Sequence, residues 1–477
     1  MVPMSDFRSP RLPRGPAPAL ALLGSALLAA GCTMIPTYER PPAPVPGSFA
    51  GEATTARPGP KASDVEWQSY FADERLKRLI ELALKNNRDL RVAVLNIEQV
   101  RAAYQIKRAD EWPTINAAAS GLRQTAGPDN ITSTYSVGLA VSSYELDLFG
   151  RVRSLSQAAL AQYLATEETR KAVQISLIAS VANGYFNLLA DDELLEVTKQ
   201  TLKTREDSQK LTRLKFDNGA SSELDLRQAE SLLEAARVSL AQQTRQRALD
   251  ENALVLLLGQ ALPDDLPAGV PLVADQVLPE VPAGLPSDLL NRRPDVRAAE
   301  QQLIAANANI GAARAAFFPR ITLTGLVGSV SSELSGLFKS GSFGWSFQPQ
   351  ATLPIFDAGR NKANLDSVKV GREIALAQYE KAIQTAFREV SDSLAGRATL
   401  GEQARAQRAQ ADAEQARYRL ADLRYRNGAA SYLDVLDAQR SLFTAQQAVV
   451  QVQAQQAQNL VTLYKALGGG WKDAAAN

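Results

Sequence analysis

The side chains best suited to chemistry in this sequence are carboxylates at the starts of long helical stretches. Asp434 and Asp437 are three residues apart, so a helix places both on one face, and Asp225 is the equivalent of Asp434 in an internal repeat. The first copy of the repeat has Gln228 in place of a counterpart to Asp437. Carboxylates held this close repel each other and attract cations. A solvated helix face is the default interpretation of such a pattern.

The composition excludes most other active-site chemistry. Histidine is absent and Cys32 is the only cysteine among 477 residues. This excludes Ser-His-Asp and Cys-His triads, His- or Cys-ligated zinc, CxxC redox pairs and intrachain disulfides. Lys and Arg number 52 against 51 Asp and Glu, a balance that favours neither nucleic acid nor acidic substrates. We expect no cofactor and no metal. A carboxylate-dependent hydrolase is the enzyme alternative, but nothing places two carboxyls across a cleft.

Residues 1–31 have the pattern of an export signal. Arginines precede an apolar run from Ala17 to Ala30, and this run of about 14 residues is too short to span a bilayer as a helix. The run ends at Leu28-Ala29-Ala30-Gly31-Cys32, which resembles a bacterial lipobox, so we expect cleavage after residue 31 and a covalent lipid on Cys32. An ordinary signal with a chance cysteine is the alternative. Prolines after Cys32 predict an extended, lipid-anchored segment over 32–60.

The rest of the chain repeats itself once, at an offset of 206 to 209 residues. The matching blocks are Asp89-Leu90-Arg91 with Asp295-Val296-Arg297, Trp112-Pro113 with Phe318-Pro319, Gly150-Arg151 with Gly359-Arg360, Phe216-Asp217-Asn218-Gly219 with Tyr425-Arg426-Asn427-Gly428, and Leu258-Gly259 with Leu467-Gly468. Such matches in one order indicate a duplicated unit. We place its two copies at residues 61–285 and 286–477.

Each copy is predicted to begin with a helix followed by two strands. Apolar residues recur at helical spacing from Arg75 to about Arg108, and Trp112-Pro113 ends that helix. Apolar residues take alternate positions in residues 135–142, in residues 321–328 and in a returning strand over 345–355. These segments therefore read as strands with one apolar face.

A long helical hairpin completes each copy. Ala- and Gln-rich stretches almost free of proline run from Arg151 to Phe216 and onward from Arg360. Asn218-Gly219 and Asn427-Gly428 interrupt the helical pattern where the chain must reverse, because Asn and Gly tolerate the left-handed conformation that ends a helix. Each Asn-Gly pair therefore predicts a hairpin tip. A soluble coiled coil would have the same periodicity.

Strands with one apolar face on an exported chain indicate that the strands stand in a membrane. Only helices and closed barrels satisfy every backbone group in hydrocarbon, and the smallest outer-membrane barrels have about eight strands. Four strands per chain cannot close a barrel, so several copies must share it. Counting alone allows a dimer or a trimer. Trp345, Phe347 and Tyr135 are candidates either for aromatic girdles at the membrane surfaces or for ordinary strand packing.

Several segments closely resemble the TolC-like outer-membrane factors of tripartite efflux pumps, in the OprM/NodT-type lipoprotein branch. They are residues 32–41, 285–300, 431–440 and 467–471, so the resemblance extends from Cys32 to Trp471. It implies a mixed, mainly α fold, in which a homotrimer forms a twelve-stranded outer-membrane β-barrel continued by a periplasmic α-helical barrel. The implied function is a passive, non-enzymatic exit duct for drugs or other small molecules. An inner-membrane transporter, often of the resistance-nodulation-division type, would drive export through a periplasmic adaptor.

The resemblance also implies roles for single residues. Asp434 and Asp437 match paired aspartates that ring the narrow periplasmic entrance, where threefold symmetry would gather six carboxylates into a cation ring. Tyr425 matches a gate-bonding tyrosine, and Asp225 its partner from the first copy. Ala430 stands where TolC has a gate arginine, so any lock must use other residues.

The hairpin tips at Asn218-Gly219 and Asn427-Gly428 would form the periplasmic end that meets the adaptor. We therefore expect a lipid-anchored protein of the outer membrane with a long periplasmic extension, in contact with outer-membrane lipid and not with nucleic acid. A periplasmic helical adaptor or scaffold lipoprotein is the rival interpretation. The four alternating strands argue against it.

Overall fold

A computed structural model describes residues 33–49, 64–125, 127, 131–272 and 286–471. The predicted export signal and Cys32 lie outside the described residues. The chain forms two compact units, here called the strand unit and the hairpin unit. The strand unit comprises Met1–Glu39, Arg101–Gln162 and Leu303–Ala375, and the hairpin unit comprises Arg40–Val100, Tyr163–Gln302 and Leu376–Asn477. Helices α4 (Arg88–Ala109), α5 (Arg151–Asp217), α8 (Pro294–Ala315) and α9 (Arg360–Arg426) contribute residues to both units.

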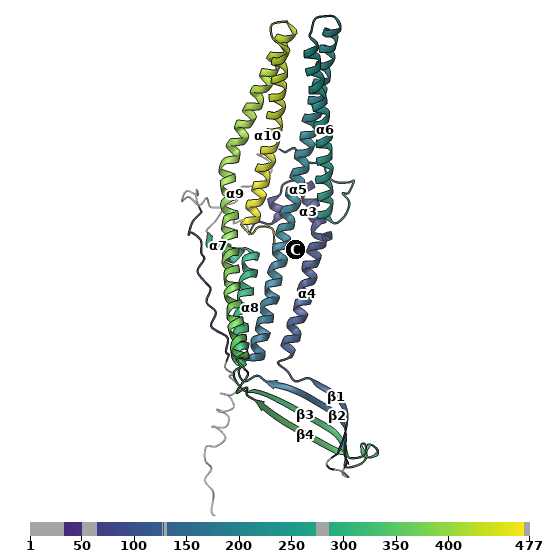
Figure 1. Cartoon of the computed structure of the whole chain (residues 1–477), viewed down its shortest axis with the longest axis vertical. Coiled ribbons are helices and arrows are strands. Elements are labelled where there is room, and N and C mark those ends of the chain that lie inside the picture. The colour runs from purple at the N-terminus through teal and green to yellow at the C-terminus, as the bar shows by residue number, and fades with distance from the viewer. Residues whose placement is uncertain (1–32, 50–63, 126, 128–130, 273–285, 472–477) are drawn as a thin grey trace, which may run out of the picture. The chain divides into compact units, whose positions relative to one another are not determined.

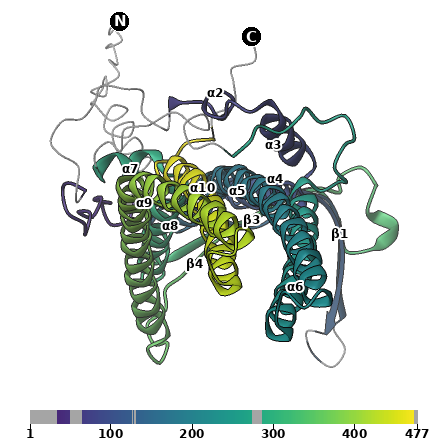
Figure 2. The same cartoon turned by 90° about the horizontal axis from the view of Figure 1, so that it is seen from above.

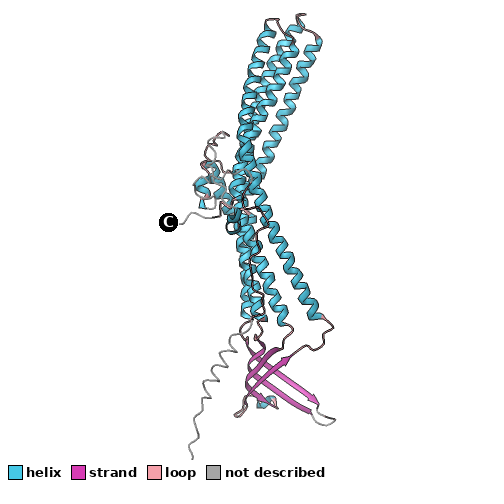
Figure 3. Ribbon diagram, turned by 90° about the vertical axis from the view of Figure 1, so that its left-hand side faces the viewer, coloured by secondary structure: helices cyan, strands magenta, loops and turns pink. Residues whose placement is uncertain are grey.

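The strand unit contains an antiparallel sheet in the order β1-β2-β3-β4 (Figures 1 and 3). The strands are β1 (Ile115–Thr125), β2 (Ile131–Leu146), β3 (Arg320–Ser331) and β4 (Phe343–Thr352), and a short 3-10 turn, η2 (Leu334–Gly336), lies between β3 and β4. Each strand pairs with the next one in the chain. Among the described strands, β1 and β4 are therefore the two edges of the sheet.

The predicted apolar face of the strands is confirmed by their register. Ala117, Leu139, Val327 and Trp345 lie opposite one another across the four strands. All three large side chains of this row are exposed, Trp345 at 71%. Because alternate residues of a strand point to one side, the row belongs to a single face, and this face is apolar and uncovered within one chain.

Two details of the strands differ from expectation. The returning strand ends at Thr352, so Leu353 and Ile355 lie beyond β4, because Pro354 lacks the N–H that a ladder needs. Pro349 lies inside β4, opposite Leu323 of β3, and has no N–H to donate to a ladder. The register of β2 shifts between Val141 and Tyr144 at a bulge.

Glycines allow an unusually close approach at the centre of the sheet. Gly138 of β2 lies directly opposite Gly328 of β3. A Cβ atom added to Gly138 would lie 2.2 Å from the backbone oxygen of Val327, and one added to Gly328 would lie 2.2 Å from that of Val137. Only glycine fits at these two positions.

The hairpin unit holds the predicted long hairpins. Helices α5 and α9 each contain 67 residues, which corresponds to about 100 Å at 1.5 Å per residue. They are followed by α6 (Glu223–Leu258) and α10 (Tyr432–Ala466). Viewed from above, the ribbons of α9 and α10 run beside each other (Figure 2). The helix predicted over Arg151–Phe216 is confirmed to within one residue at its end.

The helix predicted from Arg75 to Arg108 is instead two helices. Helix α3 spans Glu74–Asn86, Asn87 lies between the two helices, and α4 begins at Arg88. The Asn87 side-chain oxygen accepts a hydrogen bond from the Leu90 N–H at 2.9 Å, and its amide donates to the Leu257 carbonyl at 2.9 Å. Asn87 thus caps the start of α4 while its backbone is extended, which breaks the helix. The unit also contains α2 (Trp67–Tyr70) and α7 (Pro286–Arg292).

One helix among the described residues, α5, contains a stretch long and apolar enough to cross a membrane by length and composition. The share of this stretch that is buried inside the chain is 56%. Leu177, Ile178, Val181 and Ala182 of α5 are all buried. This burial is typical of a core helix in a helical bundle.

The described part of the N-terminal segment, residues 33–49, contains neither helix nor strand. In the strand unit, the Pro36 carbonyl accepts a hydrogen bond of 2.7 Å from the Asn307 amide of α8. In the hairpin unit, the Arg40 guanidinium binds both carboxylate oxygens of the buried Glu300 at 2.6 and 2.7 Å. A paired arrangement of this kind fixes an extended chain firmly against a helix.

Candidate gate at the tips of the helical hairpins

Both Asn-Gly pairs lie at helix ends, as predicted. Gly219 and Gly428 have φ angles of 74° and 70°, in the left-handed region that ends a helix. The side-chain amides of Asn218 and Asn427 donate to the carbonyls four residues earlier, at 2.7 and 2.8 Å. Each of these carbonyls also accepts the backbone N–H of the same asparagine at 3.2 Å, so the side-chain amide adds a second hydrogen bond at the end of the helix.

Asp434 lies in the first turn of α10, where it forms a capping box with Ser431. The Ser431 N–H and hydroxyl donate to Asp434 Oδ2 at 3.3 and 3.2 Å, and the Asp434 N–H donates to Ser431 Oγ at 3.4 Å. A negative charge at a helix N-terminus is also favoured by the helix dipole. Asp434 therefore has a structural function at the start of α10, which is independent of any effect of its charge on ions.

Asp225 repeats this arrangement at the start of α6. Its carboxylate accepts from the Ser222 N–H at 3.3 Å and from the Ser221 hydroxyl at 3.1 Å, while its N–H donates to Ser222 Oγ at 3.1 Å. The two hairpins thus begin their second helices with the same capping box. A serine three residues before each aspartate is the sequence signal for this capping box.

Asp437 is ion-paired with Arg417 of α9 across the second hairpin. Both side chains are largely exposed, Asp437 at 60% and Arg417 at 47%. The Arg417 guanidinium also donates to Glu414 at 3.2 Å and to the Ser441 hydroxyl at 3.4 Å. The charge of Asp437 is therefore partly balanced within its own chain.

Tyr425 lies half-buried near the end of α9. It is hydrogen-bonded to Thr212 and Ser221 of the first hairpin, and the Lys215 ammonium lies 3.9 Å from the centre of its ring. Burial raises the pKa of the Tyr425 hydroxyl, the hydrogen bond with Thr212 lowers it, and the negative charge of Asp225 raises it. Tyr425 and Asp225, predicted to be gate partners, are thus close enough to interact electrostatically.

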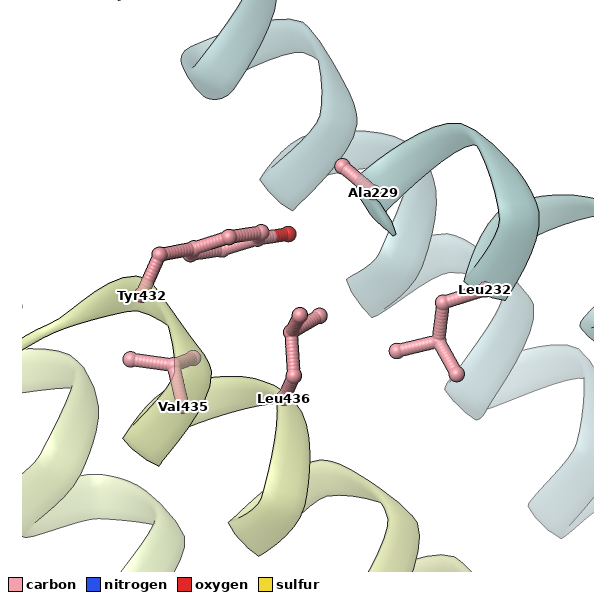
Figure 4. Packing of buried hydrophobic residues seen from close by; sticks show 5 residues of the cluster. All are labelled: Ala229, Leu232, Tyr432, Val435 and Leu436. Carbon is pink, nitrogen blue, oxygen red and sulfur yellow. The ribbon is translucent and has the colours of Figure 1, made fainter. Parts of the chain in front are cut away.

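An apolar cluster packs the two hairpins together below the turns (Figure 4). Its buried members are Ala229 and Leu232 of α6 with Tyr432, Val435 and Leu436 of α10. The side chains of Tyr418, Ala421 and Tyr425 pack against it from α9. The Tyr432 hydroxyl also lies 3.0 Å from Ser208 Oγ of α5. Burial of these apolar side chains packs α6, α9 and α10 together near the tips, and the contact between Tyr432 and Ser208 adds α5.

The residues predicted to form the gate and the cation ring thus occupy one region of the hairpin unit. Tyr425 lies beside Asp225, and Asp434 and Asp437 lie on adjacent turns of α10. Arg417, Lys215 and the capping serines were not predicted from the sequence to belong to this site. No cluster of three or more His, Cys, Asp or Glu side chains that could hold a metal ion occurs in the part of the chain that the structure describes. The arrangement offers exposed carboxylates and a polar contact between two hairpins, but no catalytic constellation.

Comparison with known proteins agrees with this geometry. Residues 79–260 and 285–469 each match the model of the outer membrane efflux protein family. The chain is 51% identical over 462 residues to the antibiotic efflux pump outer membrane protein ArpC and to the toluene efflux pump outer membrane protein TtgC, both of Pseudomonas putida. Each alignment covers 95% of both chains. The MtrE outer membrane channel of Neisseria gonorrhoeae, solved in its open state, is similar with a TM-score of 0.84 and 46% identity, covering 92% of this chain and 99% of MtrE.

The fold and these matches define a non-enzymatic channel component of an efflux pump, located in the outer membrane with a periplasmic helical extension. The chain belongs to the outer membrane efflux protein family. The two successive family matches confirm the internal repeat, and the likeness to MtrE confirms the mainly α, TolC-like fold with a four-stranded sheet.

Proposed function

We propose that three copies of this chain form the exit duct of a tripartite efflux pump. An inner-membrane transporter, of the resistance-nodulation-division type, drives small molecules through a periplasmic adaptor into this duct. The observation that carries the proposal is a membrane-type sheet that is incomplete in one chain, since β1 and β4 each have an unpaired edge. Unpaired backbone groups cannot remain in hydrocarbon.

The internal repeat supports a specific way to complete the sheet. Within one chain, β2 of the first copy pairs with β3 of the second copy. By the same relation, β4 of one chain would pair with β1 of the next chain, and repetition of this contact closes a ring. Three chains would supply twelve strands, the number that the TolC-like resemblance implies.

The helices support the same arrangement. Val92 of α4 corresponds in the repeat to Ala298 of α8, yet Val92 is 55% exposed and Ala298 only 7%. Leu95 of α4 is exposed as well. An apolar helix face left open in one copy of a repeat is covered by a neighbour when the repeat continues into another chain. The neighbouring chain of the trimer would provide this cover.

A lipid on Cys32 would anchor the chain beside its barrel. The lipobox-like sequence supports this assignment, and the tight attachment of Arg40 to Glu300 would keep the anchor close to the helices. One acyl chain gives only marginal membrane binding, so the barrel would be the main attachment. The boundaries at residues 31, 60 and 285 stay predictions.

At the hairpin tips, we assign Asp434 and Asp437 to a cation-attracting ring and the Tyr425–Asp225 contact to the gate. The exposure of Asp437 and the proximity of Tyr425 to Asp225 support these assignments. The turns at Asn218-Gly219 and Asn427-Gly428 would dock the adaptor. Ala430 stands in place of a gate arginine. We therefore assign to Arg417, which is ion-paired with Asp437, the part of the cation that helps to keep the gate closed.

The exported molecules would include antibiotics and toluene, because similar proteins are described as parts of antibiotic and toluene efflux pumps. Selection among such molecules would occur upstream, since the duct receives whatever the transporter delivers. A passive duct needs no cofactor.

The function is tested in a bacterium that lacks its own outer-membrane efflux channel but keeps a compatible transporter and adaptor. Expression of this chain should lower the accumulation of a fluorescent pump substrate, and the same chain without residues 115–146, which include β1 and β2, should not. If cells expressing the intact, membrane-inserted chain accumulate as much substrate as cells without it, the duct assignment fails. Recovery of the intact chain in the soluble periplasm would instead favour the scaffold lipoprotein.

A further inference from the structure

Asp191 of α5 is a buried carboxylate away from the tips, on the first hairpin. Its side chain is only 6% exposed. The Gln243 amide of α6 donates to Asp191 Oδ1 at 2.9 Å. The other oxygen, Oδ2, is buried and receives no hydrogen bond from the residues that the structure describes. A buried carboxylate oxygen without a partner is costly, so this atom calls for an explanation.

Asp250 of α6 lies within hydrogen-bonding reach of Asp191. Asp250 itself accepts a hydrogen bond of 3.1 Å from Gln246. Two ionised carboxylates can only accept, so they cannot bond to each other. One proton placed between them turns the repulsive contact into a hydrogen bond and satisfies the orphaned oxygen.

We propose that Asp191 and Asp250 share one proton, which bonds α5 to α6 and makes the first hairpin sensitive to pH. When this proton is lost, the negatively charged carboxylates of Asp191 and Asp250 face each other. The proposal concerns a contact within one chain, so it does not depend on the trimer or on the gate assignments.

The surrounding charges do not neutralise the pair. On α5, Asp192 adds a third negative charge, and Glu193 interacts with Arg408 of α9. On α6, Arg247 is occupied by Asp192 and Glu251. Helix α3 also packs against α6. Four of its charged side chains form pairs, Lys77 with Glu74 and Arg78 with Glu81, and the Arg75 guanidinium donates to the Pro267 carbonyl at 3.5 Å.

These surroundings explain the direction of the titration. Burial is the largest cause, followed by the hydrogen bond and the negative charge of Asp250, and together they raise the pKa of Asp191 from its ordinary 3.8 to about 7. The folded protein therefore keeps a proton between about pH 4 and pH 7 that the unfolded chain has released. The stability contributed by this proton falls as pH rises through that window and is absent above it.

The consequence is a contact between α5 and α6 that loosens as the pH rises through about 7. Below pH 7 the shared proton would hold α6 against α5. Above pH 7 the two carboxylates would repel, and the part of α6 around Asp250 would open more often.

Infrared difference spectroscopy of the full-length protein in detergent tests the shared proton. Between pH 6 and pH 8, the wild type should lose one protonated-carboxyl band per chain. Asp191→Asn and Asp250→Asn should each remove that change, whereas Asp207→Asn, an exposed aspartate of the same helix, should keep it. Identical difference spectra for wild type and Asp191→Asn would overturn the proposal.

Hydrogen exchange provides the second readout and remains informative if one of the variants fails to fold. After correction for the intrinsic pH dependence of exchange, amides of residues 243–254 should exchange at least severalfold faster at pH 8 than at pH 6 in the wild type. In whichever Asn variant folds, the ratio should be close to one. A wild-type ratio of one would show that no pH-sensitive contact exists.

Discussion

Asp437 of α10 is ion-paired with Arg417 of α9, so one of the two aspartates assigned to the cation ring has a positive partner in its own chain. The other, Asp434, is hydrogen-bonded to Ser431 and has no such cation among the described residues. The two carboxylates, although three residues apart, therefore contribute differently. Asp434 supplies an uncompensated charge, and Asp437 joins the two helices of a hairpin.

Arg417→Met should make the channel more selective for cations. The change frees the charge of Asp437 and removes a link between α9 and α10, and because the ion pair is exposed to solvent its loss should have little effect on stability. Reversal potentials in planar bilayers under a KCl gradient measure the effect. Arg419→Met removes the same charge from the same helix and serves as the control. Equal shifts for the two variants would contradict a specific role of the pair.

Asp434→Asn combined with Asp437→Asn should reduce cation selectivity. The double change removes both negative charges while keeping side chains that accept hydrogen bonds at the same positions. The same bilayer recordings provide the measurement. Unchanged selectivity would refute the assignment of these residues to a cation ring.

Ser431→Ala should separate the structural function of the capping box from its charge. Loss of the cap should destabilise the start of α10 by about 1 kcal/mol, because a helix N–H loses its acceptor. Hydrogen exchange near residues 431–436 should increase, whereas cation selectivity should not change. A change in selectivity without faster exchange would mean that the serine acts on permeation directly.

Gly138→Ala should prevent correct assembly of the sheet. The added methyl group would lie 2.2 Å from the Val327 carbonyl oxygen, and a backbone atom there cannot move aside without breaking the pairing of β2 and β3. Gly325→Ala is the matched control, since its methyl group would meet no atom closer than 3.5 Å. Heat-stable oligomers on gel electrophoresis should be lost only in Gly138→Ala. Equal yields of oligomer would show that the close approach is unimportant.

Asn87→Ala should lower the stability of the hairpin unit by about 1–3 kcal/mol. The change removes the cap of α4 and leaves the Leu257 carbonyl without its donor. Asn86→Ala removes an exposed hydrogen bond to Gln260 and should have a much smaller effect. Thermal unfolding in detergent compares the two, and equal midpoints would argue against the helix break as a structural requirement.

Cys32→Ala should abolish incorporation of radiolabelled palmitate but leave the exported protein in the membrane fraction after carbonate extraction. The barrel would supply the second and stronger attachment. Complete release into the soluble periplasm would contradict membrane insertion of the strands. Residual labelling would place the lipid elsewhere.

Much of the fold was predictable because its signals are periodic. The apolar alternation around Leu139 and Val327 predicted strands with a common face, and the register of the sheet confirms it. The helix from Arg151 and the turn at Asn218-Gly219 were predictable for the same reason, since a long stretch without proline ends at a strong turn signal. Because the sequence repeats, each helix or strand predicted in the first copy also predicts the equivalent helix or strand in the second copy.

What sequence missed are contacts between residues far apart in the chain. Asn87 lies within a helical pattern, and only its bond to Leu257 explains why the helix breaks there. The pairing of Arg417 with Asp437 depends on the relative register of two antiparallel helices, which no local pattern specifies. The sharing of a proton between Asp191 and Asp250 depends on the burial of Asp191, which the sequence does not reveal.

Native mass spectrometry of the protein extracted from outer membranes tests most directly whether several chains must share one pore. We predict a detergent-dependent particle of three chains, because β1 and β4 of each chain need partners. A stable particle of one chain that stays in solution without detergent would contradict the duct.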